Sequence, residues 1–104
     1  MKYYHVAKEW DGENLQSLSE REGESEALDI YAEKWPEAGG LAMHHIAVIH
    51  LHSNIDDARN FVADFGGEIL EIDGEEIEVE IDSLEYPHPV CKQEIDAACI
   101  RRVK

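Results

Sequence analysis

The chain lacks long apolar runs and contains few cysteines. A membrane-spanning helix needs about 20 consecutive apolar residues, so we expect no membrane association. The opening segment 1–5 has no apolar core of a secretion signal, which predicts a cytoplasmic location. Cys91 and Cys99 stand eight residues apart without the spacing of metal ligands. We therefore expect both to be small core residues rather than a disulfide.

Positive charge is also scarce, with 9 Lys and Arg against 24 Asp and Glu and a formal net charge of −15. A surface of this sign repels phosphate groups, which argues against binding to a nucleic-acid backbone. It permits a basic protein partner. The length of 104 residues suits one domain, 1–104, with one modest core.

The apolar spacing predicts an α+β domain without a linker or an internal repeat. A first strand is expected over 2–6, and a short helix within 14–23. Stronger signals predict helices over about 24–35, ended by Pro36, and about 54–65, ended by Gly66-Gly67. Ser53 and Asp56 resemble a capping box at the start of the second of these helices.

Two β runs, 68–72 and 76–81, flank Asp73-Gly74, which predicts a hairpin. Ile77, Val79 and Ile81 are expected to face inward, and the alternating acids to form an outward stripe of Glu76, Glu78, Glu80 and Asp82. A solvated sheet face explains this stripe best. Calcium prefers converging loop carboxylates, so a calcium site is disfavoured. Mimicry of a nucleic-acid backbone is a further alternative.

The tail 95–103 is expected to return to the sheet through one helical turn.

The segment 44–52 carries four histidines among apolar residues, which predicts a buried strand. On a strand His44, His50 and His52 would share one face and His45 the other, with His44 about 20 Å from His50. Two imidazoles on one face can bind zinc or iron, but two alone are a weak signal. A third metal ligand from His5, Glu85 or His88 would be a guess. Hydrogen-bonded structural histidines and an organic-ligand site are the alternatives.

Several separated segments together resemble the bacterial His-Tyr-Glu branch of the ADP-ribosyltransferase-like superfamily. Its aromatic-His-Gly-Thr strand corresponds to Tyr4-His5-Val6-Ala7, and its Val-Tyr-Leu-Thr strand to Ile49-His50-Leu51-His52. The Ala helix leading to Gly-Gly and a β run matches Ala58 and 65–73. The Glu-Tyr segment and the later Ile-Pro-x-Glu-Tyr-Ile match 85–90 and 94–100. The resemblance implies a mixed, mostly antiparallel sheet split around a cleft, with two main helices.

The resemblance also implies roles for individual residues. His5 would bind the ribose next to nicotinamide, and His50, in place of the Tyr, would stack on nicotinamide. Tyr4 and His52 lie in the same two motifs and join the NAD site. Glu85 would be the catalytic acid, because positive charge develops on the sugar as nicotinamide leaves.

The chain departs from the family pattern in the same motifs. Val6 replaces a Gly that lies against nicotinamide, and Ala7 and His52 replace two threonines. These changes suit either a weakly active NAD-dependent ADP-ribosyltransferase with an unknown acceptor or an inactive, binding-only descendant. The superfamily's RNA 2′-phosphotransferases are disfavoured because basic residues are few. The sequence permits two other functions. The chain could be a non-catalytic acidic module that binds a basic partner, or a small histidine-based metal-binding protein.

Overall fold

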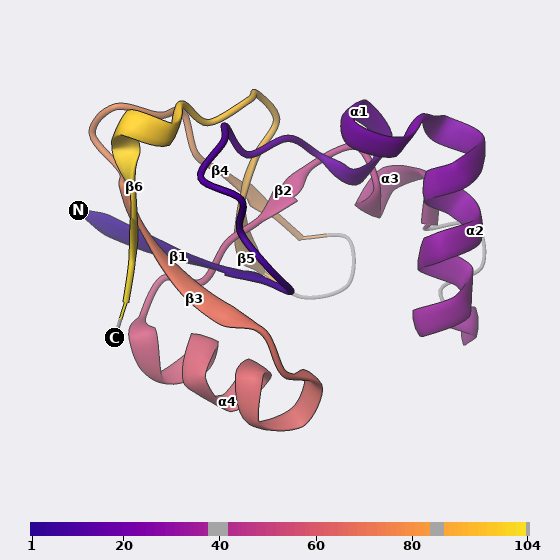
Figure 1. Cartoon of the computed structure of the whole chain (residues 1–104), viewed down its shortest axis with the longest axis horizontal. Coiled ribbons are helices and arrows are strands. Elements are labelled where there is room, and N and C mark those ends of the chain that lie inside the picture. The colour runs from indigo at the N-terminus through magenta and orange to yellow at the C-terminus, as the bar shows by residue number, and fades with distance from the viewer. Residues whose placement is uncertain (38–41, 84–86, 104) are drawn as a thin grey trace.

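The first of two antiparallel sheets joins the two ends of the described chain. The computed structural model describes residues 1–37, 42–83 and 87–103 (Figure 1). Strands β1 (Lys2–Ala7), β3 (Glu68–Asp73) and β6 (Ile100–Arg102) form the sheet in the order β1-β3-β6. A 3-10 turn, η2 (Ala97–Cys99), precedes β6. The predicted first strand and the return of the tail through one helical turn are thus confirmed.

The second sheet is smaller and lies beside β1. It contains β2 (Ile49–His50), β5 (His88–Cys91) and β4 (Glu80–Asp82) in the order β2-β5-β4. Just after β2, the backbones of Tyr4 and His52 exchange two hydrogen bonds with N···O distances of 2.9 and 2.6 Å. Through this pair the six strands follow one another as β4-β5-β2-β1-β3-β6. The α+β class and the split sheet agree with the prediction, although every strand pairing described is antiparallel rather than mixed.

The predicted hairpin of 68–72 with 76–81 is wrong. The chain does turn at Asp73-Gly74, where the Gly74 amide donates to the Met1 carbonyl at 2.9 Å. Strand β3, however, has β1 on one edge and β6 on the other. Because both edges are occupied, the returning segment cannot pair with β3. It runs on without strand structure until β4, which pairs with β5 in the other sheet.

The predicted strand over 44–52 is also wrong for most of its length. Residues Ala42–His45 form a short helix, α3, and strand β2 begins only at Ile49. The Ile46 amide donates to the Ala42 carbonyl at 3.0 Å, which continues the helical turn. Ala42, His45 and Ile46 are buried at helical spacing, i, i+3 and i+4. A short apolar run fits a buried helix turn as well as a strand, so its composition could not separate them.

The remaining helices follow their sequence signals closely. α1 (Leu18–Glu22) begins after Ser17 and ends at Gly23, and α2 (Glu24–Lys34) follows directly. α4 (Ile55–Phe65) ends at Gly66 as predicted. Its N-cap is Asn54, whose side chain accepts from the Asp57 amide at 2.9 Å, rather than Ser53 with Asp56. An Asn side chain caps as well as Ser, and here it lies directly before the first helical turn.

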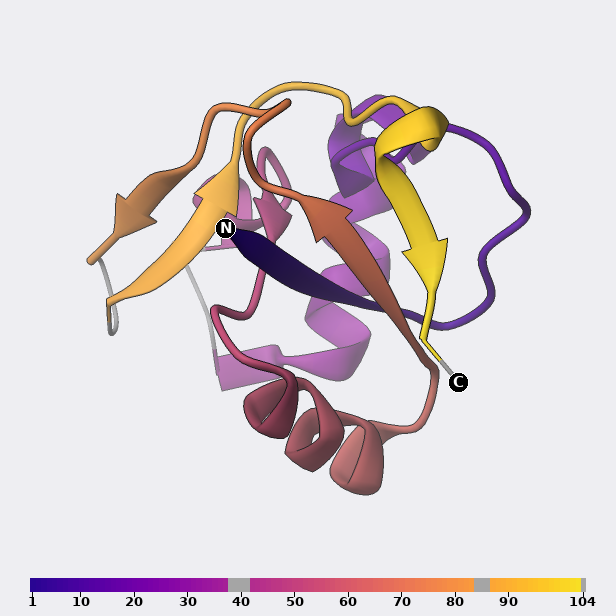
Figure 2. The ribbon, with the colours of Figure 1, turned by 90° about the vertical axis from the view of Figure 1, so that its left-hand side faces the viewer.

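The helices cover the sheets from two sides. α1, α2 and α3 gather at one end of the molecule, while α4 packs under β1 and β3 (Figures 1 and 2). The core lies between the two sheets and is closed by a bridge from Leu15 to Ile95. Its buried members are Leu15, Ile49, Leu51, Leu70, Ile72, Cys91, Ile95 and Ile100. Within residues 1–37, 42–83 and 87–103, no helix has the length and apolarity to cross a bilayer.

Candidate functional site

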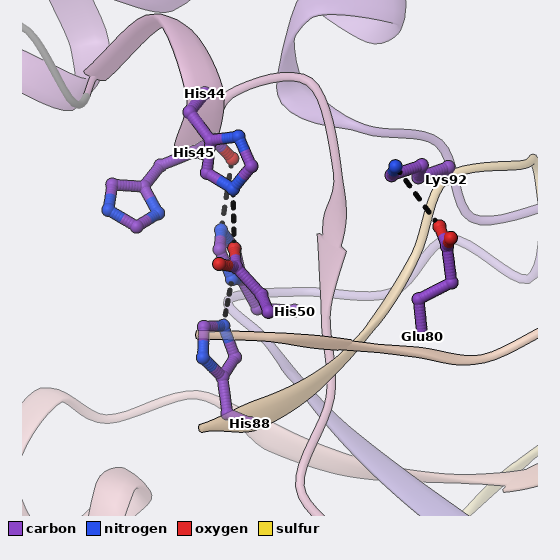
Figure 3. A network of polar contacts seen from close by, with 7 residues as sticks. His44, His45, His50, Glu80, His88 and Lys92 are labelled. Carbon is purple, nitrogen blue, oxygen red and sulfur yellow. Dashed lines mark hydrogen bonds and ion pairs between the residues drawn. The ribbon is translucent and has the colours of Figure 1, made fainter. Parts of the chain in front are cut away.

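Five imidazoles and one carboxylate meet where α3 packs on the second sheet beside β1. We call His5, His44, His45, His50, His88 and Asp82 the histidine cluster. Figure 3 shows two sets of contacts: one runs from the His45 carbonyl through His50 to His88, and in the other His44 contacts Asp82. These four histidines come from α3 and β2, which are close in sequence, and from β5, which lies about 40 residues further along the chain.

His50 is the centre of the cluster, because both of its ring nitrogens are engaged. Its Nε2 lies 2.9 Å from the His45 carbonyl, and in the neutral ring it donates a proton there. Nδ1 of that tautomer is a lone pair, and Nε2 of His88 donates to it at 3.0 Å. The two rings also stack, with centroids 5.2 Å apart and planes at 20°. The position of His50 is therefore fixed by one carbonyl and one other imidazole.

His44 and Asp82 form a second contact within the cluster. The His44 Nε2 and an Asp82 carboxylate oxygen are 2.5 Å apart, and Asp82 is buried with 7% of its surface exposed. This overturns the prediction that Asp82 continues an outward acidic stripe. Ile81, predicted to face inward, is 64% exposed. The prediction assigned these two side chains to the wrong faces because strand β4 begins only at Glu80. In that strand Asp82 lies opposite His88, on the side of the sheet that α3 covers.

His5 reaches the cluster from the neighbouring sheet. Its Nδ1 donates to the His50 carbonyl at 2.7 Å, which leaves Nε2 as the lone pair of the neutral ring. Successive strand residues point to opposite faces, so Tyr4 lies on the other face of β1. His52 pairs with Tyr4, and its ring contacts Phe61 of α4 at a centroid distance of 5.6 Å. The structure thus brings His5 and His50 together and gives Tyr4 and His52 different neighbours.

The prediction that His45 and His50 lie on opposite faces, with His44 far away, is also wrong. The ring centroids of His45 and His50 are 5.4 Å apart, and those of His44 and His45 are 5.6 Å apart. The helical turn of α3 folds the segment back on itself, which a strand would not do.

Burial keeps the central imidazoles neutral. It lowers the pKa of His50 to about 4, because the hydrogen bond to the His45 carbonyl only partly offsets the loss of water. Nearby His88, His45 and His5 lower this pKa further. Burial likewise lowers the pKa of His5 and of His52. At neutral pH these rings therefore bind through hydrogen bonds and stacking rather than through charge.

Glu85, the predicted catalytic acid, lies outside the described residues. The sequence analysis missed Asp82 as a member of the site and named His88 only as a guess at a metal ligand. One signal for His88 was available, since it is the only histidine that follows the hairpin region and it precedes the apolar pair Val90-Cys91. No signal separated Asp82 from the acids before it.

A cavity of about 360 Å³ lies away from the histidine cluster. Five carboxylates line it, together with Ile77, Gln93 and two thiols: Glu75, Glu76, Glu78, Glu94, Asp96, Cys91 and Cys99. Cys91 is buried as expected, Cys99 is half-buried, and both are free thiols. Burial raises the pKa of both thiols, so neither is a reactive thiolate at neutral pH. The chemistry of this cavity is that of its carboxylates.

In the part of the chain that the structure describes, no three His, Cys, Asp or Glu side chains are arranged to hold one metal ion. Comparison of the chain with known protein families, with curated proteins and with solved structures finds no match.

Proposed function

We propose that this chain is a divergent ADP-ribosyltransferase-like domain that binds NAD, or a fragment containing nicotinamide, at the junction of its two sheets. The observation that carries the proposal is the contact between His5 on β1 and His50 on β2, at 2.7 Å. The resemblance assigns the first two signature positions to these residues. The split sheet, with β1 beside β2, is the arrangement that the resemblance implies.

The protonation states of the two rings suit such a ligand. Because His5 donates through Nδ1, its Nε2 is an acceptor for a ribose hydroxyl. Because the pKa of His50 is lowered to about 4, its ring is neutral at pH 7. A neutral ring stacks on the positively charged nicotinamide of NAD without charge repulsion. To stack on nicotinamide, His50 would have to lose its contact with His88 or offer the part of its ring that His88 does not cover.

Turnover, in this proposal, depends on Glu85. His88 is the β5 side chain that contacts His50. An imidazole there cannot supply the negative charge that stabilises a developing sugar cation. A carboxylate from the adjacent segment is therefore required for cleavage of NAD, and Glu85 is the one that the resemblance assigns.

Binding is tested by NMR on the uniformly labelled protein with NAD, nicotinamide mononucleotide and ADP-ribose at millimolar concentration. We expect shifts at His5 and His50 with the two nicotinamide-containing ligands and weaker shifts with ADP-ribose. His5→Ala should weaken binding. Glu80→Gln is the control, because Glu80 is an exposed residue paired with Lys92. Absence of shifts at His5 and His50 at millimolar NAD would remove the proposal.

Turnover is tested separately by chromatography of nicotinamide released from NAD. Glu85→Gln keeps the shape of the side chain and removes its charge, so the release should fall to background while NAD binding persists. Glu80→Gln should release nicotinamide at the wild-type rate. Equal release by the wild type and Glu85→Gln, including none from either, would exclude the catalytic role of Glu85.

A second function, a module that binds a basic partner, is favoured by the acid-lined cavity. Its five carboxylates lie in a protein of net charge −15. An oligolysine peptide serves as the probe, and its binding should weaken as salt rises. Glu76→Lys with Glu78→Lys should abolish binding, while Glu33→Lys on α2, away from the cavity, should change it little. Equal loss in both variants would indicate attraction to net charge alone.

A further inference from the structure

His50 and His88 present ring nitrogens to each other from two strands of the second sheet. The His50 Nδ1 and the His88 Nε2 are 3.0 Å apart and the ring centroids 5.2 Å apart, so both nitrogens lie between the rings (Figure 3). Two nitrogens that bind one zinc ion, each at about 2.0–2.1 Å, lie about 3.4 Å apart at the tetrahedral angle. To accept an ion, the rings would therefore have to separate by a few tenths of an ångström and turn toward it.

The contacts of His50 hold it in the form that a metal ion requires. A metal-binding imidazole uses the lone pair of one nitrogen and donates its other N–H to a carbonyl or carboxylate, which orients the ring. In His50, Nε2 donates to the His45 carbonyl at 2.9 Å and Nδ1 carries the lone pair. The His50 carbonyl is held as well, because the His5 Nδ1 donates to it at 2.7 Å. Both the ring and the backbone of His50 are thus positioned before an ion binds.

His88 can provide the second nitrogen by a change of tautomer. In the contact described, its Nε2 donates to His50. With the proton on Nδ1 instead, the Nε2 lone pair faces the ion. A neutral imidazole carries its proton on either nitrogen, so this change leaves the charge of the ring unaltered. Binding therefore replaces one hydrogen bond by two metal–nitrogen bonds and releases no proton.

A buried carboxylate on the same face of the sheet offsets part of the charge of a divalent ion. Asp82 lies directly opposite His88 in the β4–β5 register. His50 lies opposite Val90, two residues after His88. Because opposite residues share a face, and so do residues two apart on one strand, these three side chains project from the face that α3 covers. The His44 ring of α3 holds the Asp82 carboxylate there at 2.5 Å.

We propose that His50 and His88 form a zinc-binding site in which water completes the coordination shell. Imidazole suits zinc, whereas magnesium and calcium prefer oxygen ligands. Within residues 1–37, 42–83 and 87–103 no three side chains surround one ion, so positions remain for water. This pair differs from the pair of His50 and His52 that the sequence suggests, because the His52 ring lies against Phe61 of α4. The site does not depend on NAD binding.

Calorimetric titration with Zn²⁺ tests the site, with NAD absent and magnesium in excess to occupy exposed carboxylates. We expect one zinc ion per chain. Long-range ¹H–¹⁵N spectra of the zinc-loaded protein should show shifts at the His50 Nδ1 and the His88 Nε2, with the His52 ring nearly unchanged. Absence of zinc binding, or shifts at His52 in place of His88, would overturn the proposal.

Matched histidine variants assign the ion to this pair. His88→Gln removes one metal ligand and keeps a donor for the His50 Nδ1, so zinc affinity should fall about tenfold or more, as it does on loss of even an outer-shell partner. If that variant does not fold, His50→Gln serves instead, because its amide can still donate to the His45 carbonyl. His52→Gln is the control and should keep the wild-type affinity. Wild-type affinity in folded His88→Gln or His50→Gln would overturn the proposal, and so would an equal or larger loss in His52→Gln.

Discussion

At the residue scale, Asp82 shows how a single buried carboxylate holds α3 on the second sheet. The side chain of His44 is about a third exposed, at 34%, whereas that of Asp82 is buried, at 3%. Water can therefore solvate His44 but not Asp82. The contact satisfies the carboxylate and fixes the end of α3 next to His45, whose carbonyl positions His50.

Asp82→Ala should destabilise the protein by about 1–3 kcal/mol, because it removes a charge-assisted hydrogen bond in a buried place. Glu80→Ala, two residues earlier on the same strand, is the matched control. Its ion pair with Lys92 is exposed, so its loss should cost less than about 0.5 kcal/mol. Urea denaturation at pH 7 measures both values. Equal costs for the two variants would show that the His44–Asp82 contact contributes nothing beyond a surface pair.

The titration of His50 gives a second prediction at this scale. Its ring resonances should shift with a midpoint at about pH 4, because burial and three neighbouring imidazoles disfavour the charged form. Two-dimensional ¹H–¹³C spectra recorded from pH 7.5 to 3.5 measure the midpoint. A midpoint near 6.5 would mean that water reaches the ring freely.

The family resemblance named His5 and His50 together, and the structure places them in contact, with the His5 Nδ1 2.7 Å from the His50 carbonyl oxygen. The resemblance could not find their partners. Whether Asp82 faces water or α3 depends on which residue of β5 lies opposite it, and this register is set by tertiary pairing. The local alternation of acids and apolar residues suggested the opposite face.

At the element scale, the connection from α4 to β3 explains why two glycines follow the helix. Both have positive φ, +77° at Gly66 and +105° at Gly67. A Cβ at Gly66 would meet nothing within 4 Å, whereas one at Gly67 would lie 2.6 Å from the Ala7 carbonyl oxygen. Gly66 thus allows the backbone turn that ends helix α4, and Gly67 allows β3 to approach β1 closely.

Gly66→Ala should cost about 1 kcal/mol through its backbone conformation alone. Gly67→Ala should cost about 1–3 kcal/mol more, because β1 must also move away from the new methyl group. Thermal or urea unfolding of the two single variants gives the comparison. Equal costs would mean that β1 yields without loss of its pairing.

The long helices and strand β3 were predictable from their termination signals and apolar spacing. These signals are local, and the structure keeps them at α2, α4 and β3. The pairing of β3 was not predictable. An Asp-Gly turn favours a hairpin, but β1 and β6, which are distant from β3 in sequence, occupy both of its edges.

At the scale of the whole molecule, the few basic residues are unevenly distributed. Lys2 and Arg101 both contact Glu71, and Arg102 contacts Glu68. Hydrogen bonds from Lys2 and Arg101 lower the pKa of Glu71, and that of Glu68 is lowered by the Trp10 amide and Arg102. Three of the nine basic side chains thus pair with carboxylates of the first sheet, whereas five carboxylates line the cavity.

This imbalance predicts that salt stabilises the fold. With a net charge of −15, mutual repulsion opposes the compact state. Screening shortens the reach of that repulsion from about 30 Å at 0.01 M salt to about 3 Å at 1 M. The thermal midpoint at pH 7.5 should therefore rise across this range, by about 4–8 °C for each kcal/mol gained.

Sodium chloride and choline chloride should act alike, because screening depends on ionic strength rather than on the kind of cation. A midpoint that does not rise with either salt would show that the carboxylates are too far apart to repel one another, and a rise with sodium alone would indicate a bound cation.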